Sequence, residues 1–318
     1  MRFYALFALV TLAGFSVVCL VVSLAVSGIW RATGDAFGQL VAARRGRWLL
    51  ALRFAPTVCA TAAALALGFA FLAYEPRNTG EAAGSVLSAL AAMAVVLASL
   101  AISRSARLVA SDSALSRLVR HCRQWTGTNG AAAAILDSSY PVAAVAGVFR
   151  PRLMLSARVL RECGPEEIEA IVAHEHAHMR RHDNLSRALL TALPDRWFAP
   201  RTYDQIEAAW TLAAEEAADT EAAGSAGARR AVLAATLIRV AKMADVAPPA
   251  WMPQLAFYQG VGLEYRVRAL LAEPRHDPAR IAFVETSAIA LAICLVGLAA
   301  MSLPALHSLI EWSVRLLP

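Results

Sequence analysis

Four histidines and one glutamate fall within the stretch AIVAHEHAHMRRHDNL, residues 170–185. His174, Glu175 and His178 form an HExxH pattern. Residues four apart lie on one face of a helix, so these two imidazoles can bind a single zinc ion. The glutamate beside the first histidine can then accept a proton from the attacking water. The pattern predicts a zinc-dependent peptide hydrolase with one Zn²⁺ per chain and Glu175 as its general base.

The other two histidines of this stretch are not expected to bind the metal. His182 lies eight residues after His174, which is about 12 Å along a helix axis, so one straight helix cannot bring both to one ion. His176 points to a different face of the helix. We interpret both as polar surface or as contacts to the ligands. The side chain that stabilises the oxyanion is not identified, and Tyr203 and His182 are candidates.

A catalytic zinc site needs a third protein ligand. The segment WTLAAEEAADTEAA, residues 210–223, carries three acidic candidates. Glu215 and Asp219 lie four residues apart on an expected helix. In glutamate-ligand zinc proteases such a glutamate binds the metal, and an aspartate one turn later holds a histidine ligand. We predict Glu215 as the third ligand, Asp219 as the supporting residue and Glu216 as the alternative ligand. Without HExxH upstream, these acids would indicate only a solvated helix face.

The residues around HExxH favour the helix that these ligands require. Pro165, directly after Gly164, suits a first helical position. Acidic side chains favour the positive end of the helix dipole: Glu166, Glu167 and Glu169. Apolar side chains recur at helical spacing: Ile168, Ile171 and Val172. Pro194 stops any continuation of this helix.

The composition indicates a membrane protein. Hydrophobic residues make up 58% of the 318 residues and charged residues only 17%, which is too apolar for a soluble domain of this length. Four apolar stretches each reach the ~20 residues that a helix needs to cross a bilayer. They are residues 3–30, 54–74, 84–103 and 281–306.

Arginine placement predicts the orientation of these spans, because positively charged loops stay in the cytoplasm. Arginines gather in the expected first loop and after the third span: Arg31, Arg44, Arg45, Arg47, Arg104, Arg107, Arg117, Arg120 and Arg123. We therefore expect both termini outside a bacterial cell membrane. The chain would consist of a membrane anchor (1–103), a cytoplasmic zinc peptidase domain (104–280) and a fourth span with a short outer tail (281–318).

Several motifs, in the same order, resemble those of the BlaR/MecR family of membrane-bound antirepressor zinc metallopeptidases. They are PVAAVAGVFRPRLMLSARVL (141–160), GPEEIEAIVAHEHAHMRRHDNL (164–185), RWFAP (196–200), EEAAD (215–219) and EYRVRALL (264–271). The order of three spans, peptidase domain and fourth span also agrees. Archetypes of the family carry a penicillin-binding sensor after the fourth span. This sequence ends at Pro318, so we expect a member without that sensor.

The resemblance implies a mainly α membrane protein with four transmembrane helices and a gluzincin-like α+β domain with a small sheet. A strand at about 143–155 should border the active-site cleft, with Pro151 indicating an edge position. An extended substrate would bind there, at Ala143, Val145 and Gly147. The implied partners are the lipid bilayer and a protein substrate, by family analogy a winged-helix repressor. The oligomeric state is left open.

Other functions are weighed against this one. The formal charge is +6, but no dense basic patch with interleaved aromatic residues is present, so direct nucleic-acid binding is not expected. A quality-control protease of the HtpX or CAAX-processing type shares HExxH and ExxxD, and would cleave unfolded membrane proteins broadly. A non-enzymatic signalling scaffold with a structural zinc would bind the metal without glutamate-dependent proteolysis.

Overall fold

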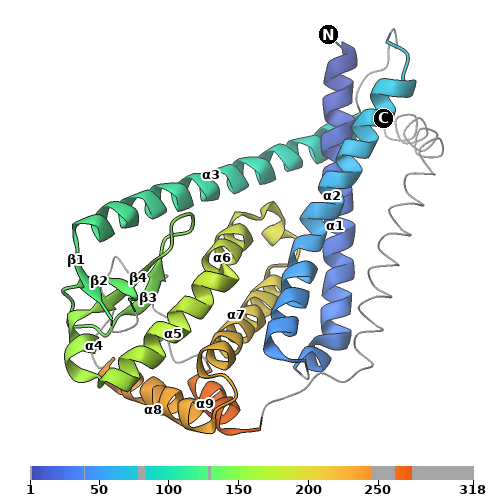
Figure 1. The fold of residues 1–318 in the computed structure, drawn as a ribbon. Coiled ribbons are helices and arrows are strands. Elements are labelled where there is room, and N and C mark those ends of the chain that lie inside the picture. The colour runs from blue at the N-terminus through green and yellow to red at the C-terminus, as the bar shows by residue number, and fades with distance from the viewer. Residues whose placement is uncertain (1, 39, 78–83, 128–129, 245–261, 274–318) are drawn as a thin grey trace.

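The computed structural model describes residues 2–38, 40–77, 84–127, 130–244 and 262–273. This part of the chain is mainly helical and contains one four-stranded mixed sheet (Figure 1). Three long helices come first: α1 (Arg2–Phe37), α2 (Ala42–Tyr74) and α3 (Ser85–His121). Each is long and apolar enough to cross a membrane. They correspond to the first three predicted spans, whereas the fourth, 281–306, lies outside the described residues.

The three helices extend beyond the predicted spans. The expected first loop is largely helical, because Arg31 lies in α1 while Arg44, Arg45 and Arg47 lie in α2. Residues 104–121, expected at the start of the peptidase domain, continue α3. These extensions are rich in Ala, Leu and Arg, which favour helix, so the helices do not end where the apolar run ends. α1 and α2 lie side by side, and α3 leads from them to the sheet (Figure 1).

The sheet is small and has the strand order β1-β2-β4-β3. Its strands are β1 (Arg123–Thr126), β2 (Ala132–Leu136), β3 (Ala143–Ala146) and β4 (Arg152–Ser156). β2 and β4 are parallel, and the other two pairs are antiparallel. The sheet therefore has β3 at one edge and β4 inside.

The prediction of one strand over 143–155 is wrong, because β3 and β4 form a hairpin. Gly147 turns the chain with a φ of 97°, and a Cβ there would lie 2.8 Å from the carbonyl oxygen of Arg150. This conformation is open to glycine and strained for other residues. Pro151 lies in the turn that precedes β4 and does not mark an edge strand.

The HExxH segment lies on α5 (Pro165–Arg181), which begins at the predicted proline. The backbone N–H of Gly164 donates to Glu167 Oε2 at 2.8 Å and so satisfies one free donor at the helix start. The helix ends at Arg181, because His182 adopts a left-handed conformation with a φ of 55°. His182 is therefore not part of the same straight helix as His174, contrary to the sequence-based assumption.

The remaining elements are α4 (Ala157–Glu162), α6 (Asp183–Ala192), the 3₁₀ helix η1 (Pro194–Trp197), α7 (Pro200–Ala223), α8 (Gly227–Met243) and α9 (Leu263–Leu271). α5 and α7 contact each other, and most of their buried apolar residues belong to different hydrophobic cores. The C-terminal end of α7 and Ala170 of α5 meet in a third cluster with α8 and α9. α7 packs on α1 and α2, which together are called the membrane hairpin below. The contacts involve Val26, Leu49, Tyr203, Ile206 and Trp210. α5 packs on the sheet and α8 through Ala143, Leu155, Ile171, Val172 and Val240.

A buried arginine of α2 anchors the start of α7 to the membrane hairpin. Arg53 binds Asp195 Oδ1 at 2.7 Å and Glu207 Oε1 at 2.8 Å. Its guanidinium lies 4.0 Å from the centre of the Tyr203 ring. Charges buried to this extent need partners, and here each carboxylate meets the same guanidinium. The ligand-bearing helix α7 is thus fixed to α2 at its N-terminal end.

Candidate metal centre

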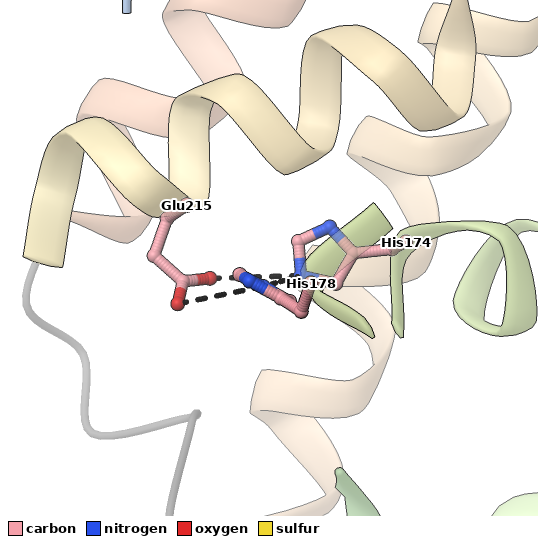
Figure 2. Close-up of side chains that lie close together, drawn as sticks. All are labelled: His174, His178 and Glu215. Atoms are coloured by element: carbon pink, nitrogen blue, oxygen red, sulfur yellow. Dashed lines mark hydrogen bonds and ion pairs between the residues drawn. The ribbon is translucent and has the colours of Figure 1, made fainter. Parts of the chain in front are cut away.

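The structure brings three predicted ligands together between α5 and α7. Figure 2 shows the carboxylate of Glu215, from α7, pointing at the imidazoles of His174 and His178, from α5. The two Nε2 atoms lie 3.1 Å apart. Glu215 oxygens lie 3.6 Å from His174 Nε2 and 3.7 Å from His178 Nε2. In the described part of the chain, these three side chains form a group that could hold a metal ion.

These separations fit a zinc ion. Ligand atoms about 2.1 Å from zinc in a tetrahedral arrangement lie about 3.4 Å from one another. The two Nε2 atoms lie 3.1 Å apart, and the nearest Glu215 oxygens lie 3.6 and 3.7 Å from them, which is close to that spacing. Two histidines and one glutamate are also the donor set of catalytic zinc sites that keep a fourth position open. The donor set and its geometry therefore fit a catalytic zinc better than a closed structural site.

Two aspartates orient the histidines from behind. His174 Nδ1 lies 2.9 Å from Asp219 Oδ1, and His178 Nδ1 lies 2.7 Å from Asp183 Oδ2. The Nδ1–H of His178 is positioned to donate to Asp183, which directs the lone pair of its Nε2 at the metal position. His174 is in ion-pair contact with Asp219. The structure thus places Asp219 where the sequence predicted a histidine-holding residue, against the first histidine.

Asp183 was not predicted as a functional residue. It follows His178 by five residues, a spacing that does not bring two side chains together on a continuous helix. The left-handed turn at His182 folds the chain back, so that Asp183 begins α6 and reaches His178. The sequence feature that could have identified Asp183 is its position just after the HExxH helix. That position points to a contact with His178 only if the helix ends at Arg181.

Arg266 of α9 was also missed. Its Nε and Nη2 donate to the two carboxylate oxygens of Asp219 at 2.8 and 2.7 Å, while Nη1 lies 3.0 Å from Glu215 Oε2. This planar, two-pronged contact fixes the orientation of Asp219 and supplies positive charge to a buried cluster of carboxylates. The residue lies within the EYRVRALL motif, but no periodicity of the sequence connects it to the ligands.

The charges of the site favour cation binding. Burial alone would lower the pKa of His174, but hydrogen bonds to Asp219 and Glu215 outweigh it and raise that pKa to about 10. Burial raises the pKa of Glu215, yet His174, His178 and Arg266 together lower it well below its usual range. The metal-free site therefore attracts protons to its imidazoles. A metal ion must displace them, so metal affinity should fall as the pH falls.

Glu175, the predicted general base, is buried close enough to His174, His178 and Glu215 to interact with them electrostatically. Its side chain is 1% exposed, and Oε2 has no hydrogen-bond partner among the residues that the structure describes. Burial raises the pKa of this carboxyl, which is the direction needed for a group that exchanges protons near neutral pH. A buried carboxylate oxygen without a partner is costly and indicates a position where water or substrate binds.

Other predicted residues lie elsewhere. Glu216, the alternative ligand, turns away from the histidines and pairs with Arg45. Tyr203 lies in the core against Arg53, so the structure does not place it where an oxyanion would form. His176 is half-buried and His182 is exposed, and neither belongs to the described group of converging ligand atoms.

The predicted substrate-binding residues lie at the outer edge of the sheet. Ala143 and Val145 belong to edge strand β3, which packs against α5, and Gly147 follows in the turn. Nδ2 of Asn184 donates to the carbonyls of Val145 and Gly147 at 2.8 and 3.0 Å. Asn184 thus connects this edge to the chain that leaves the HExxH helix, and occupies part of the row that an added strand would use.

Replacing Arg266 with methionine is expected to weaken zinc affinity by about 10- to 100-fold, because Asp219 and Glu215 lose the cation that orients them. Affinity is measured by competition with a chromophoric chelator. Arg268→Met is the matched control, since Arg268 lies on the same helix with a side chain that is 78% exposed. Equal zinc affinity of the Arg266→Met variant and the wild type would contradict this role.

Comparison with protein families matches most of the chain to a known family. A family model described as BlaR1 peptidase M56 matches residues 72–269, which run from the end of α2 through most of α9 and include all the side chains of the candidate metal centre. Neither the curated proteins nor the solved structures yield a match.

Proposed function

The chain belongs to the BlaR1 peptidase M56 family, and from this premise we propose that it is a membrane-anchored, zinc-dependent endopeptidase. The family is one of metallopeptidases, and three apolar helices indicate association with a membrane. The observation that carries the proposal is the convergence of His174, His178 and Glu215 beside the buried, unpartnered oxygen of Glu175.

In this proposal His174, His178 and Glu215 hold the metal, with Asp219, Asp183 and Arg266 orienting them. When bound, a zinc ion supplies Lewis acidity, which makes water a stronger acid and polarises the peptide carbonyl. The protein preorganises these side chains through buried ion pairs, and the imidazoles must give up their protons when the metal binds.

Glu175 transfers the proton. Its carboxylate accepts a proton from the attacking water as the oxygen bonds to the peptide carbonyl carbon. The same carboxyl then donates that proton to the leaving amine nitrogen as the C–N bond breaks. Burial raises the pKa of this carboxyl, which favours its acceptance of the proton from water.

An extended peptide would add to the outer edge of β3 at Ala143, antiparallel or parallel to the strand. Because Asn184 already binds the carbonyls of Val145 and Gly147, the substrate either pairs beyond these groups or displaces the amide. Edge pairing holds the peptide backbone extended next to α5, where Glu175 lies.

The finer parts of the proposal rest on the sequence and on family analogy. The arginine distribution supports a cytoplasmic peptidase domain at 104–280, and the apolar run at 281–306 supports a fourth span followed by an outer C-terminal tail. The gluzincin-like fold rests on family analogy. The substrate would be a winged-helix repressor, whose cleavage releases transcription.

Metal removal tests the proposal. The full-length chain, purified in detergent, is expected to bind one zinc ion and to lose proteolysis when 1,10-phenanthroline removes it, with recovery on adding zinc. Cleavage is followed on an unfolded protein such as casein and on the winged-helix repressor encoded nearest to this chain. Selective cleavage of the repressor supports the regulatory role, and broad cleavage of unfolded proteins supports a quality-control protease. Zinc binding without cleavage of either would refute the peptidase assignment.

A further inference from the structure

A buried ion pair connects the membrane hairpin to the turn of α7 that carries Glu215. Arg45, near the start of α2, places Nη2 2.6 Å from Glu216 Oε2. The hydroxyl of Tyr265, on α9, donates to the same carboxylate oxygen at 3.0 Å. Glu216 is the immediate neighbour of Glu215, so these contacts connect α2 and α9 to the turn of α7 that carries the predicted third ligand.

The same turn of α2 lies against both ligand-bearing helices. A Cβ at Gly46 would lie 3.9 Å from the Cβ of Ala213 on α7 and 4.0 Å from Arg181 Nη2 at the end of α5. Arg181 in turn lies 3.4 Å from Asp183, which holds His178. The first turn of α2 therefore contacts both helices and can affect the position of α7 relative to α5.

The apolar packing of α2 on α7 leaves a gap near this turn. A cavity of about 300 Å³ lies where α2, α7 and α9 meet, bordered by Val41, Ala42, Glu216 and Tyr265 among others. Side chains next to a cavity lack contacts on one side, so they constrain a helix position weakly. The polar contacts of Arg45 and Tyr265 with Glu216 bridge the elements around it.

We propose that Arg45, acting through Glu216, is a positioning residue that makes zinc binding depend on the placement of membrane helix α2. The α5 residues that precede the histidines, Ile171 and Val172, pack with the sheet and α8. Ala213 and Ala214, which precede Glu215 on α7, pack instead with α1 and α2. A displacement of α2 relative to the sheet moves Glu215 away from the histidines. A change in the position of the membrane helices would then alter the activity of the enzyme by changing zinc binding. This inference rests on the proposed function.

Zinc affinity of the full-length chain in detergent tests the inference with three variants. Arg45→Met should weaken binding at least tenfold, whereas Arg47→Met, an exposed position on the same helix, should stay within twofold of the wild type. The double variant Arg45→Met, Glu216→Met leaves no unpaired buried charge, so its melting temperature without metal should exceed that of Arg45→Met. Its zinc affinity should nevertheless remain at least tenfold reduced, because α2 no longer holds the turn.

The cobalt(II) absorption spectrum provides a second measurement, since its intensity reports the number and geometry of ligands. Both variants at Arg45 should alter that spectrum if Glu215 is displaced. Wild-type zinc affinity and spectrum in the double variant would overturn the inference and leave the pair a structural role. Failure of the proposed function looks different, because then the wild type itself would not bind one zinc ion, or would do so without Glu215.

Discussion

Replacing Glu215 with glutamine is expected to weaken zinc binding more than about 100-fold, beyond the loss typical of residues that merely support a ligand. Glutamine keeps the size of the side chain but removes the charge that balances two imidazoles and a dication. The substitution also removes the ion pair between Glu215 Oε2 and Arg266 Nη1, which lie 3.0 Å apart. Zinc content after dialysis and the affinity from chelator competition measure the effect, and proteolysis should be lost with the metal.

The control for this variant is Glu221→Gln. Glu221 lies on the same helix, is exposed, and pairs with exposed Arg180 at 2.7 Å. It should retain wild-type zinc content. If Glu215→Gln kept one tightly bound zinc ion, the third ligand would be a different group. Glu216 would not be the first replacement to test, because Arg45 and Tyr265 already hold it away from the histidines.

The ligands were predictable from the sequence to the extent that helix geometry brings residues together. The spacing of His174 and His178 places both on one face of α5, and Asp219 lies one turn after Glu215 on α7. Helix geometry does not show that α5 and α7 pack against each other. Predicting that contact required the analogy with other zinc proteases. That step placed Glu215 near the histidines, as the structure does.

The supporting residues were not predictable in the same way. Asp183 reaches His178 because a non-glycine residue, His182, adopts a left-handed conformation, which the sequence does not signal. Arg266 comes from a helix far along the chain, and its pairing with Asp219 is set by the packing of α9 on α7 and α8. The helices also continue beyond the predicted spans, since the length of an apolar run predicts a span but not the helix that extends past it.

The separation of the two cores has a consequence for regulation. A peptidase anchored in a membrane can change its activity without any change at the HExxH helix if its third ligand belongs to the membrane-facing core. Here α7 is held at its start by Arg53 and near its ligand by Arg45, both from α2. The proposed role of Arg45 then implies that a displacement of α2 reaches Glu215, through α7, more directly than it reaches His174.

Replacing Glu175 with glutamine should separate metal binding from catalysis. The amide cannot accept a proton from water, so proteolysis is expected to fall by about 10²- to 10⁴-fold, the usual contribution of a general base. Zinc affinity should stay within a few-fold of the wild type, because Glu175 is not among the three converging ligands. Glu169→Gln, an exposed position on the same helix, controls for a general effect on α5. Unchanged cleavage would exclude Glu175 as the base. Loss of zinc together with activity would instead show that this carboxylate holds the metal, and that the partnerless Oε2 marks a ligand and not a proton acceptor.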